Sequence, residues 1–197
     1  MEISTKPYFF VLLVALGAAL AFGAARSSAA TVTLVPNPGF ETGPCGFAGP
    51  IICDWNVLPG TTMTWDMANP HSGSASMKLS GTGRGFGIQA SSTACIKIHR
   101  GPHLASFWYR TSDARATEAI LGVEWYVTAG CSFANAGFDE LSVLSPVADG
   151  AWHEVTGTLT GPPATKSAFF FVGESCDSCT AVLTMNFDDL VFDNNRR

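Results

Sequence analysis

The sequence predicts an all-β protein, a two-sheet antiparallel β-sandwich of the jelly-roll type. Three observations support this fold class. Apolar and polar residues alternate in short runs, no window longer than about ten residues has the 3.6-residue spacing of a helix, and each run ends at a cluster of Gly, Pro, Ser or Thr. The 197 residues include 20 Gly and 11 Pro, which fits a chain with many turns. Turns recurring every eight to twelve residues or so are typical of sandwiches and jelly rolls.

We expect about ten strands, each taken from one of these runs. In chain order the runs are 31–35, 62–67, 74–80, 85–90, 95–99, 103–110, 118–128, 138–144, 152–160, 166–173 and 181–192. The two clearest are 103–110 and 118–128, because they are long and alternate regularly. Alternate residues of a strand point to opposite faces of its sheet, so each run also predicts which side chains are buried.

The face assignment singles out four candidate ligand-binding residues. If Phe107 points into the core, then Trp108 and Arg110 point outward from the run 103–110. Glu124 and Tyr126 lie on the outward face of 118–128, and all four share one surface should the two strands pair. Aromatic rings offer flat apolar surfaces to sugars, and planar charged groups bind pairs of hydroxyls. The alternative is that Trp108 lies under a loop and Arg110 only pairs with Glu124.

The first thirty residues have the order of a secretory signal peptide. Lys6 precedes an uncharged apolar run at 8–25, and small residues at Ser28 and Ala30 follow it. We therefore expect cleavage near Ala30, a β-sandwich domain at 31–193 and a polar tail at 194–197. The mature protein is expected outside the membrane, in the extracellular or periplasmic space. The alternative is an uncleaved anchor, because about eighteen apolar residues approach the length of a membrane span.

Six cysteines in an exported chain indicate disulfides. The sequence leaves their fifteen possible pairings open. Cys45 and Cys53 bracket a Gly/Pro loop, and Cys176 and Cys179 form a C-x-x-C motif, so both pairs are candidate local bridges, which leaves Cys95 with Cys131. The C-x-x-C spacing also occurs in redox and zinc sites, but it stands here between strand-like runs and without a second ligand pair.

Composition and motifs narrow the function classes. The net charge of -5 argues against nucleic-acid binding, which requires a basic face. No nucleophile elbow or H-E-x-x-H motif is present, so no catalytic residue is assigned. Two enzymatic alternatives stay open. A glycosidase would draw its two carboxylates from Glu124, Asp139 and Glu140. A jelly-roll polysaccharide lyase would use residue types found at Gln89, His99, Arg100, Tyr109 and Arg110.

Three segments resemble the carbohydrate-binding modules of the CenC-like type. They are LVPNPGFETG at 34–43, HSGSASMKLSG at 71–81 and NFDDLVF at 186–192, and the resemblance extends over about 34–193. These modules are galactose-binding-like β-jelly rolls. The resemblance implies a structural calcium ion where the three segments meet, with carboxylates from Glu41, Asp188 and Asp189 and carbonyls around Gly39, Ser72, Gly73 and Lys78. Calcium prefers six to eight oxygen ligands, and such a site would tie distant parts of the chain together.

The leading expectation is a secreted, non-catalytic β-sandwich that binds a polysaccharide or glycan and is stabilised by calcium and disulfides. One alternative is a module of the same fold that binds proteins at a cell surface or in a matrix. A carbohydrate-binding module is also compatible with docking to an enzyme. A third is a small jelly-roll lyase or hydrolase. Fold alone does not choose among these functions.

Overall fold

The computed structural model describes residues 33–46, 51–82, 87–132, 135–176 and 180–193. Eleven strands and no helix occur within these ranges. The strands are β1 (Trp55–Val57), β2 (Thr61–Asp66), β3 (Ser76–Gly81), β4 (Ile88–Ser92), β5 (Ile96–Lys97), β6 (Pro102–Arg110), β7 (Glu118–Tyr126), β8 (Asn135–Leu144), β9 (Trp152–Thr160), β10 (Ser167–Ser175) and β11 (Leu183–Phe192).

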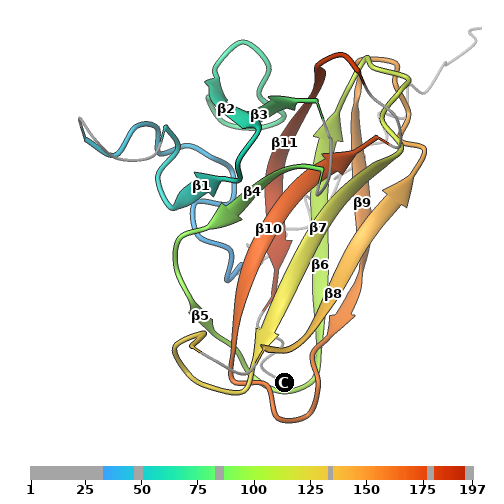
Figure 1. Ribbon diagram of the computed structural model, residues 1–197. Helices are drawn as coiled ribbons and strands as arrows, with labels where there is room; N and C mark the ends of the chain where they lie inside the picture. Colours follow the sequence, from blue (N-terminus) through green and yellow to red (C-terminus); the bar gives the residue numbers. More distant parts are fainter. Residues whose placement is uncertain (1–32, 47–50, 83–86, 133–134, 177–179, 194–197) are drawn as a thin grey trace, which may run out of the picture.

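The strands form two antiparallel sheets that pack face to face (Figure 1). The first, here called the β7 sheet, has the order β1-β4-β10-β7-β8, with β5 added beside β10. The second, the β6 sheet, has the order β2-β3-β11-β6-β9. In Figure 1 the strands β10, β7 and β8 lie in front of β11, β6 and β9. The predicted antiparallel sandwich is therefore confirmed.

The core lies between the sheets and is built mainly from aromatic rings. Phe107 of β6, Trp125 of β7, Phe170 of β10 and Phe192 of β11 are fully buried. The Phe170 and Phe192 rings meet edge to face at 4.9 Å, and the Trp125 and Phe192 rings lie 5.9 Å apart. Each buried ring contributes about 2–3 kcal/mol of hydrophobic free energy to folding. These rings occupy the inward positions that alternation predicts.

Two segments differ from the expected strands. Trp55–Val57 forms the short edge strand β1, although its three residues are too few for alternation to detect. The expected first strand at 31–35 contributes a single described bridge, between Thr33 and Asp193. This bridge sets the start of the domain beside the end of β11.

The strands β6 and β7 follow one another in the chain but belong to different sheets. β6 pairs with β9 and β11, whereas β7 pairs with β8 and β10. The seven residues 111–117 that connect them cross the end of the sandwich. A tight hairpin would need a loop of two to five residues. This crossing decides which side chains share a surface.

The predicted signal peptide at 1–30 and the polar tail at 194–197 lie outside the described residues. Across the part of the chain that is described, no helix has the length and apolar character needed to cross a membrane.

Candidate functional site

The four predicted ligand-binding residues lie on two different faces, so the prediction of one shared surface is wrong. Trp108 and Arg110 point outward from the β6 sheet, and Glu124 and Tyr126 point outward from the β7 sheet. The inward position of Phe107 was predicted correctly. The pairing of the two strands was the error, because the connection after Arg110 crosses between sheets.

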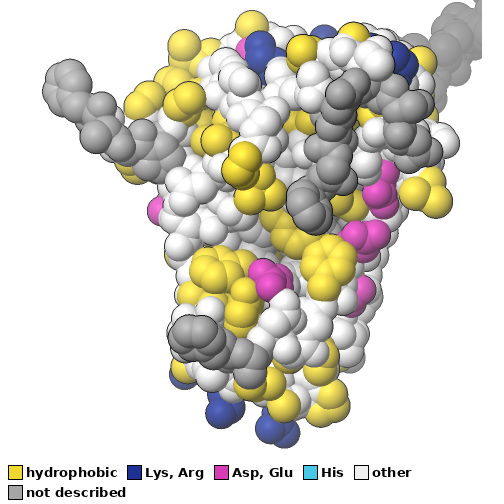
Figure 2. All heavy atoms as spheres, in the orientation of Figure 1, with side chains coloured by type: hydrophobic (Ala, Val, Ile, Leu, Met, Phe, Trp, Pro, Cys, Tyr) yellow, Lys and Arg dark blue, Asp and Glu magenta, His cyan; other side chains and the backbone are white. Residues whose placement is uncertain are grey.

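The outer face of the β7 sheet carries a cleft of about 380 Å³. Its side chains come from strands that are adjacent in space but distant in sequence. Tyr126 and Glu124 come from β7, Phe169 and Phe171 from β10, and Gln89 from β4. Figure 2 views this face and shows hydrophobic and acidic side chains gathered together on it. The cleft therefore combines ring surfaces with hydrogen-bonding groups.

Ring contacts arrange the aromatic side chains of this face into two pairs. Tyr126 and Phe169 meet edge to face at 5.9 Å, and Phe138 of β8 stacks on Phe171 at 5.0 Å with their planes 16° apart. The Phe171 ring lies directly over Gly122, where a Cβ atom would be only 1.8 Å from the ring. Gly122 thus provides the space in which Phe171 lies flat against the sheet.

Polar groups of the cleft are tied to one another. Glu124 accepts a hydrogen bond from the Asn135 side-chain amide at the start of β8. Burial raises the pKa of the Tyr126 hydroxyl to about 12, and its hydrogen bond with Glu124 adds to this shift. Tyr126 therefore stays protonated at neutral pH and can donate a hydrogen bond. Beside the rings, the cleft therefore holds a hydrogen-bond donor, Tyr126, next to an acceptor, Glu124.

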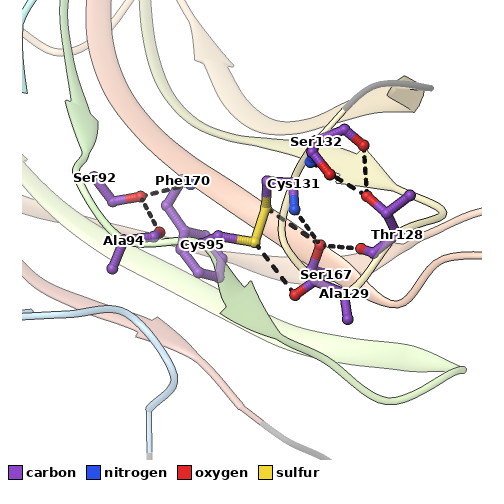
Figure 3. The surroundings of a disulfide bond; sticks show 9 residues. All are labelled: Ser92, Ala94, Cys95, Thr128, Ala129, Cys131, Ser132, Ser167 and Phe170. Carbon is purple, nitrogen blue, oxygen red and sulfur yellow. Dashed lines mark hydrogen bonds between the residues drawn. A yellow bond between two sulfur atoms is a disulfide. The ribbon is translucent and has the colours of Figure 1, made fainter.

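The Cys95–Cys131 disulfide lies beside Ser167, the first residue of β10 (Figure 3). It joins the residue before β5 to the loop after β7. The Cys131 backbone N–H donates to the Ser167 hydroxyl at 3.3 Å, and that hydroxyl donates to the Thr128 carbonyl at 2.6 Å. Because Ser167 pairs with Tyr126 in the β-ladder, the crosslink holds the loops next to this ring.

Two of the candidate disulfides are confirmed. Cys45–Cys53 and Cys95–Cys131 are both formed, with Cα–Cα distances of 5.2 and 5.7 Å. Cys176 is also disulfide-bonded, and Cys179 lies outside the described residues.

Of the three carboxylates considered for a glycosidase, two lie on one face of the sheet, and Asp139 lies on the opposite face of β8. Glu124 and Glu140 share the outer face of the β7 sheet as diagonal neighbours, because Glu124 pairs with Phe138 and Glu140 with Gly122. Burial and the charges of Glu118 and Asp139 raise the pKa of Glu140, while the Asp139 carboxylate accepts the Thr160 N–H at the end of β9.

The residues considered for a lyase are dispersed. Tyr109 is buried in the core, where its hydroxyl accepts the Val147 N–H. Arg110 belongs to the β6 sheet and Gln89 to the β7 sheet, whereas His99 and Arg100 are exposed in the turn before β6. The structure does not bring these residues together.

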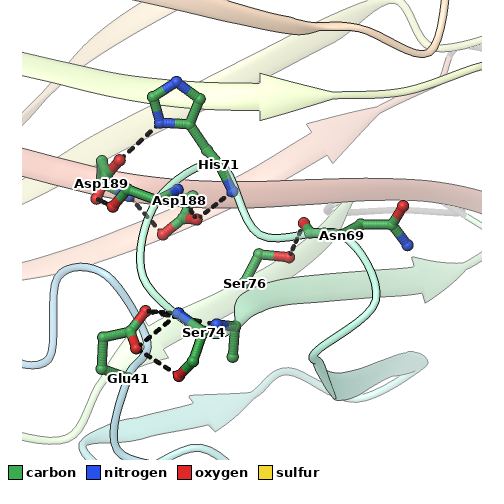
Figure 4. Close-up of polar contacts among 9 residues, drawn as sticks. Glu41, Asn69, His71, Ser74, Ser76, Asp188 and Asp189 are labelled. Carbon is green, nitrogen blue, oxygen red and sulfur yellow. Dashed lines mark hydrogen bonds and ion pairs between the residues drawn. The ribbon is translucent and has the colours of Figure 1, made fainter.

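The segments expected to hold calcium do meet around the loop 71–74 (Figure 4). Glu41 accepts hydrogen bonds from the Ser74 backbone N–H at 2.9 Å and from its hydroxyl at 2.6 Å. The Asp188 Oδ2 atom accepts the His71 backbone N–H at 2.8 Å. Asp189 accepts the Ser72 hydroxyl at 2.7 Å and contacts His71 Nδ1 at 2.6 Å.

Glycine allows the close approach of these carboxylates. A Cβ atom on Gly73 would lie 2.2 Å from Glu41 Oε1, and one on Gly39 would lie 3.5 Å from Asp189 Oδ1 and 3.8 Å from Asp188 Oδ1. Asp189 itself has a φ of 46°, at the irregularity where β11 shifts its register against β6. Lys78 differs from the other expected calcium ligands because it lies within β3, and its ammonium group is 3.8 Å from the Asp66 carboxylate.

Asp188 is fully buried, and this raises its pKa to about 6. The Asp189 charge adds to the shift, while the N–H donors of His71, Ser72 and Asp189 oppose it. Among the described residues, no three His, Cys, Asp or Glu side chains form a group able to hold a metal ion unaided. A cation there would need carbonyl or hydroxyl oxygens as well.

The outer face of the β6 sheet holds a second group of rings. His71 stacks on Trp108 at 3.8 Å, and its ring lies 5.6 Å from that of Trp152 on β9. Arg110 is the register partner of Trp152, so both leave the sheet on this side.

Comparison with solved structures identifies the type of sandwich. A Clostridium thermocellum endo-1,4-beta-D-xylanase 10B fragment, CBM22-1 and GH10 modules with xylohexaose, matches 83% of this chain with a TM-score of 0.58 and 13% identity. The matched part is 28% of that longer chain. The chain shares the fold of a carbohydrate-binding module.

Two isolated modules give the same result. The CBM22-2 xylan-binding domain of Paenibacillus barcinonensis Xyn10C matches at a TM-score of 0.57 and 13% identity, covering 80% of this chain and 98% of that one. The CBM22-1 domain of the same protein matches at 0.55 and 15% identity, covering 83% and 94%. No protein-family model and no curated protein sequence matches the chain. The similarity of fold to carbohydrate-binding modules, first indicated by three short segments, is confirmed.

The sequence interpretation did not place Gln89, Phe169 and Phe171 at a binding face, and it considered Gln89 only as a lyase residue. A signal for two of them was present in the three consecutive phenylalanines at 169–171. Once Phe170 is placed in the core, its neighbours must point outward. Gln89 gave no such signal, because its role depends on the pairing of β4 with β10.

Proposed function

We propose that this protein is a non-catalytic module that binds a polysaccharide in the cleft of the β7 sheet. The observation that carries the proposal is the combination of two aromatic pairs with the hydrogen-bonded Glu124 and Tyr126 on one open sheet face. Apolar ring surfaces pack against the C–H faces of sugars, while the polar pair meets their hydroxyls.

The shape of the site favours a chain over a single sugar. The rings span three neighbouring strands, from Phe169 and Phe171 on β10 through Tyr126 on β7 to Phe138 on β8. Adjacent strands lie about 4.8 Å apart, so the rings extend over a distance of roughly two sugar units. The solved modules of this fold described above include xylan-binding domains, which makes xylan the first polysaccharide to test.

The test is retention of the purified protein on insoluble xylan, galactan and cellulose, followed by calorimetry with xylohexaose. Phe171→Ala and Tyr126→Ala are each expected to weaken binding about tenfold, because an aromatic contact contributes roughly 1–1.5 kcal/mol. Leu104→Ala is the matched control, since Leu104 is an exposed apolar residue of the β6 sheet, 56% accessible. Its affinity should equal that of the unmodified chain.

The competing functions give different results in the same assay. Retention on no polysaccharide contradicts the proposal, and binding that survives both cleft variants contradicts the assignment of the site. Release of reducing or unsaturated ends during incubation indicates a hydrolase or lyase instead. Capture of a surface or matrix protein through the same rings, without glycan binding, indicates the protein-interaction alternative.

We further propose that calcium stabilises the junction around the loop 71–74. The fit rests on buried Asp188 and adjacent Asp189, two carboxylates whose mutual repulsion a divalent cation offsets. Glu41, Asp188 and Asp189 would supply carboxylate oxygens. The ion would tie the start of the domain to β11 and take no part in chemistry.

Thermal melting with calcium and with EDTA tests this proposal. Calcium should raise the melting temperature of the unmodified chain, and Glu41→Gln should remove most of that increase. Glu154→Gln, an exposed carboxylate on β9, is the control and should respond to calcium normally. Identical melts with calcium and EDTA contradict the proposal.

We also propose that residues 1–30 direct export and are removed near Ala30. The disulfides at Cys45–Cys53 and Cys95–Cys131 support an oxidising compartment. The first residues of protein recovered from the medium or periplasm provide the test. An N-terminus at Met1 in membrane fractions would indicate an anchor instead.

A further inference from the structure

The β6 sheet carries a second cavity, of about 510 Å³, separated from the cleft by the thickness of the sandwich. Its lining is polar. Arg110 at the end of β6, Ser112 and Arg115 in the segment that crosses between sheets, and Thr184 and Asn186 of β11 all contribute. Neither the polysaccharide cleft nor the calcium junction uses these residues.

Arg110 lines this cavity and has no oppositely charged partner among the described residues. Its Nε–H donates to the Gly150 carbonyl and an Nη1–H donates to the Asn69 side-chain oxygen. Both partners are neutral. Among the described residues no carboxylate lies within ion-pair distance of the guanidinium, and its Nη2 group has no hydrogen-bond acceptor. A half-buried arginine therefore faces the cavity with its charge uncompensated.

The remaining charges around this cavity are already paired. Arg115 forms a two-pronged ion pair with Asp113. The nearby Asp66 carboxylate accepts the Asn186 amide at 2.9 Å and lies 3.8 Å from the Lys78 ammonium.

Two more carboxylates approach from the β9 side. Asp149 contacts His153 Nε2 at 2.9 Å, and the exposed Glu154 is the register partner of Trp108, two positions from Arg110 along the ladder. Since each of the other charges has its own partner or faces solvent, Arg110 gives the cavity a net positive charge on a chain of net charge -5.

The surroundings indicate what kind of anion fits. An arginine fork binds a carboxylate through two parallel hydrogen bonds. Next to Arg110, the side chains of Trp152 and Trp108 leave the same face of the sheet and present partly exposed rings. Thr184 and Asn186 add hydroxyl and amide groups. Rings beside a guanidinium match a sugar that carries a carboxylate.

We propose that this cavity is a second ligand site, which binds an acidic sugar through its carboxylate. The guanidinium of Arg110 holds the carboxylate, and the ring of Trp152 packs against the sugar. The inference depends on the proposed function in one respect, that the ligand is a sugar. The two sites share no residue.

The experiment compares two β-1,4-linked trimers that differ only at C6, a glucose trimer and a glucuronate trimer. Amide chemical shifts of the isotope-labelled protein are followed at about 50 mM salt. We expect the glucuronate trimer to shift the amides of Ser112, Arg115 and Thr184 and to bind at least about tenfold more tightly there than the glucose trimer. Raising the salt to about 500 mM should reduce this difference.

Three variants define the site. Arg110→Gln should remove the preference for glucuronate. Ser112→Glu places a negative charge at an exposed position of the cavity rim and should also remove the preference for glucuronate. This variant keeps the Arg110 contacts, so it tests the site even where Arg110→Gln impairs folding. Arg100→Gln removes the same charge from an exposed turn elsewhere and should leave the preference intact.

The results separate this site from the cleft. Equal binding of the two trimers, or a preference that survives Ser112→Glu, overturns the proposal. Equal binding of tetraglutamate at the same amides overturns the assignment to a sugar and indicates an acidic peptide. Loss of xylohexaose binding in Phe171→Ala with glucuronate binding retained supports both sites. Retention of both ligands in that variant contradicts the cleft assignment alone, and loss of glucuronate binding in it overturns the second site.

Discussion

Replacing Glu174 by glutamine should stabilise the protein at neutral and alkaline pH. Glu174 lies on β10 and points into the sandwich, with no exposed surface. Among the described residues, nothing donates a hydrogen bond to either of its carboxylate oxygens. Burial raises its pKa to about 8, and the negative charge of Asp113 adds to the shift. A charged carboxylate is therefore unfavourable at this position.

The size of the effect follows from proton linkage. The pKa of Glu174 is higher in the folded state, about 8, than its ordinary value of 4.5. The folded protein thus holds this proton more tightly, and stability is lost as the pH rises from about 4.5 to about 8. At pH 7 the loss is about 3 kcal/mol, since each pH unit in this window contributes about 1.4 kcal/mol. Glutamine does not ionise and avoids the loss.

Urea unfolding at a series of pH values measures this difference. Glu174→Gln and the unmodified chain should be of similar stability near pH 4.5, and the variant should be more stable by about 3 kcal/mol at pH 7. Glu154→Gln, at an exposed position, is the control and should show no such trend. A stability difference that does not change between pH 4.5 and pH 8 would refute the reasoning.

Three further predictions concern the cleft, the disulfides and a buried carboxylate. Gly122→Ala should displace the Phe171 ring and lower polysaccharide affinity about tenfold in calorimetry, because a Cβ there would lie 1.8 Å from the ring. Replacing Cys95 and Cys131 by serine should lower the free energy of unfolding in urea by about 4 kcal/mol. Removing the Cys45–Cys53 disulfide should cost less, because that bond closes a loop of 8 residues and Cys95–Cys131 closes one of 36. Asp66→Asn should cost about 1–2 kcal/mol at pH 7, and this cost should shrink as the pH falls below 3.8, the ordinary pKa of an aspartate. Burial alone would raise the pKa of Asp66, but hydrogen bonds from Asn186 and Asn69 lower it, so its stabilisation is lost as the pH falls.

Strand positions were predictable because burial on one face of a sheet imposes a period of two. The runs that became β6, β7, β9, β10 and β11 show that period or a continuous apolar core. Trp55–Val57 was missed because three residues cannot show alternation, and its pairing with β4 depends on residues 33 to 37 positions later in the chain. The alternation of apolar and polar residues thus locates the long strands. It does not locate a short edge strand that is held only by a partner distant in the sequence.

The candidate site was predictable only in part. Alternation correctly placed Trp108, Arg110, Glu124 and Tyr126 on outward faces, yet it contains no information about which strands are neighbours. Two strands joined by a short segment pair in a hairpin or cross to the opposite sheet, and the choice is made by packing of the whole sandwich. The segments around Glu41, 71–74 and Asp188 converged as expected, because a resemblance in three distant segments carries the tertiary arrangement that a local pattern lacks.

The bridge between Thr33 and Asp193 has a consequence for how the domain is connected. The backbone enters and leaves the sandwich at one corner, next to the beginning of β6, where the Asp193 N–H donates to the Leu104 carbonyl. A short peptide could join the two ends, and new ends could be opened in the turn at 145–150 between β8 and β9. Such a circular permutant should fold, since it cuts no strand. Attachment of the domain to any neighbour through that corner leaves the outer faces of both sheets uncovered.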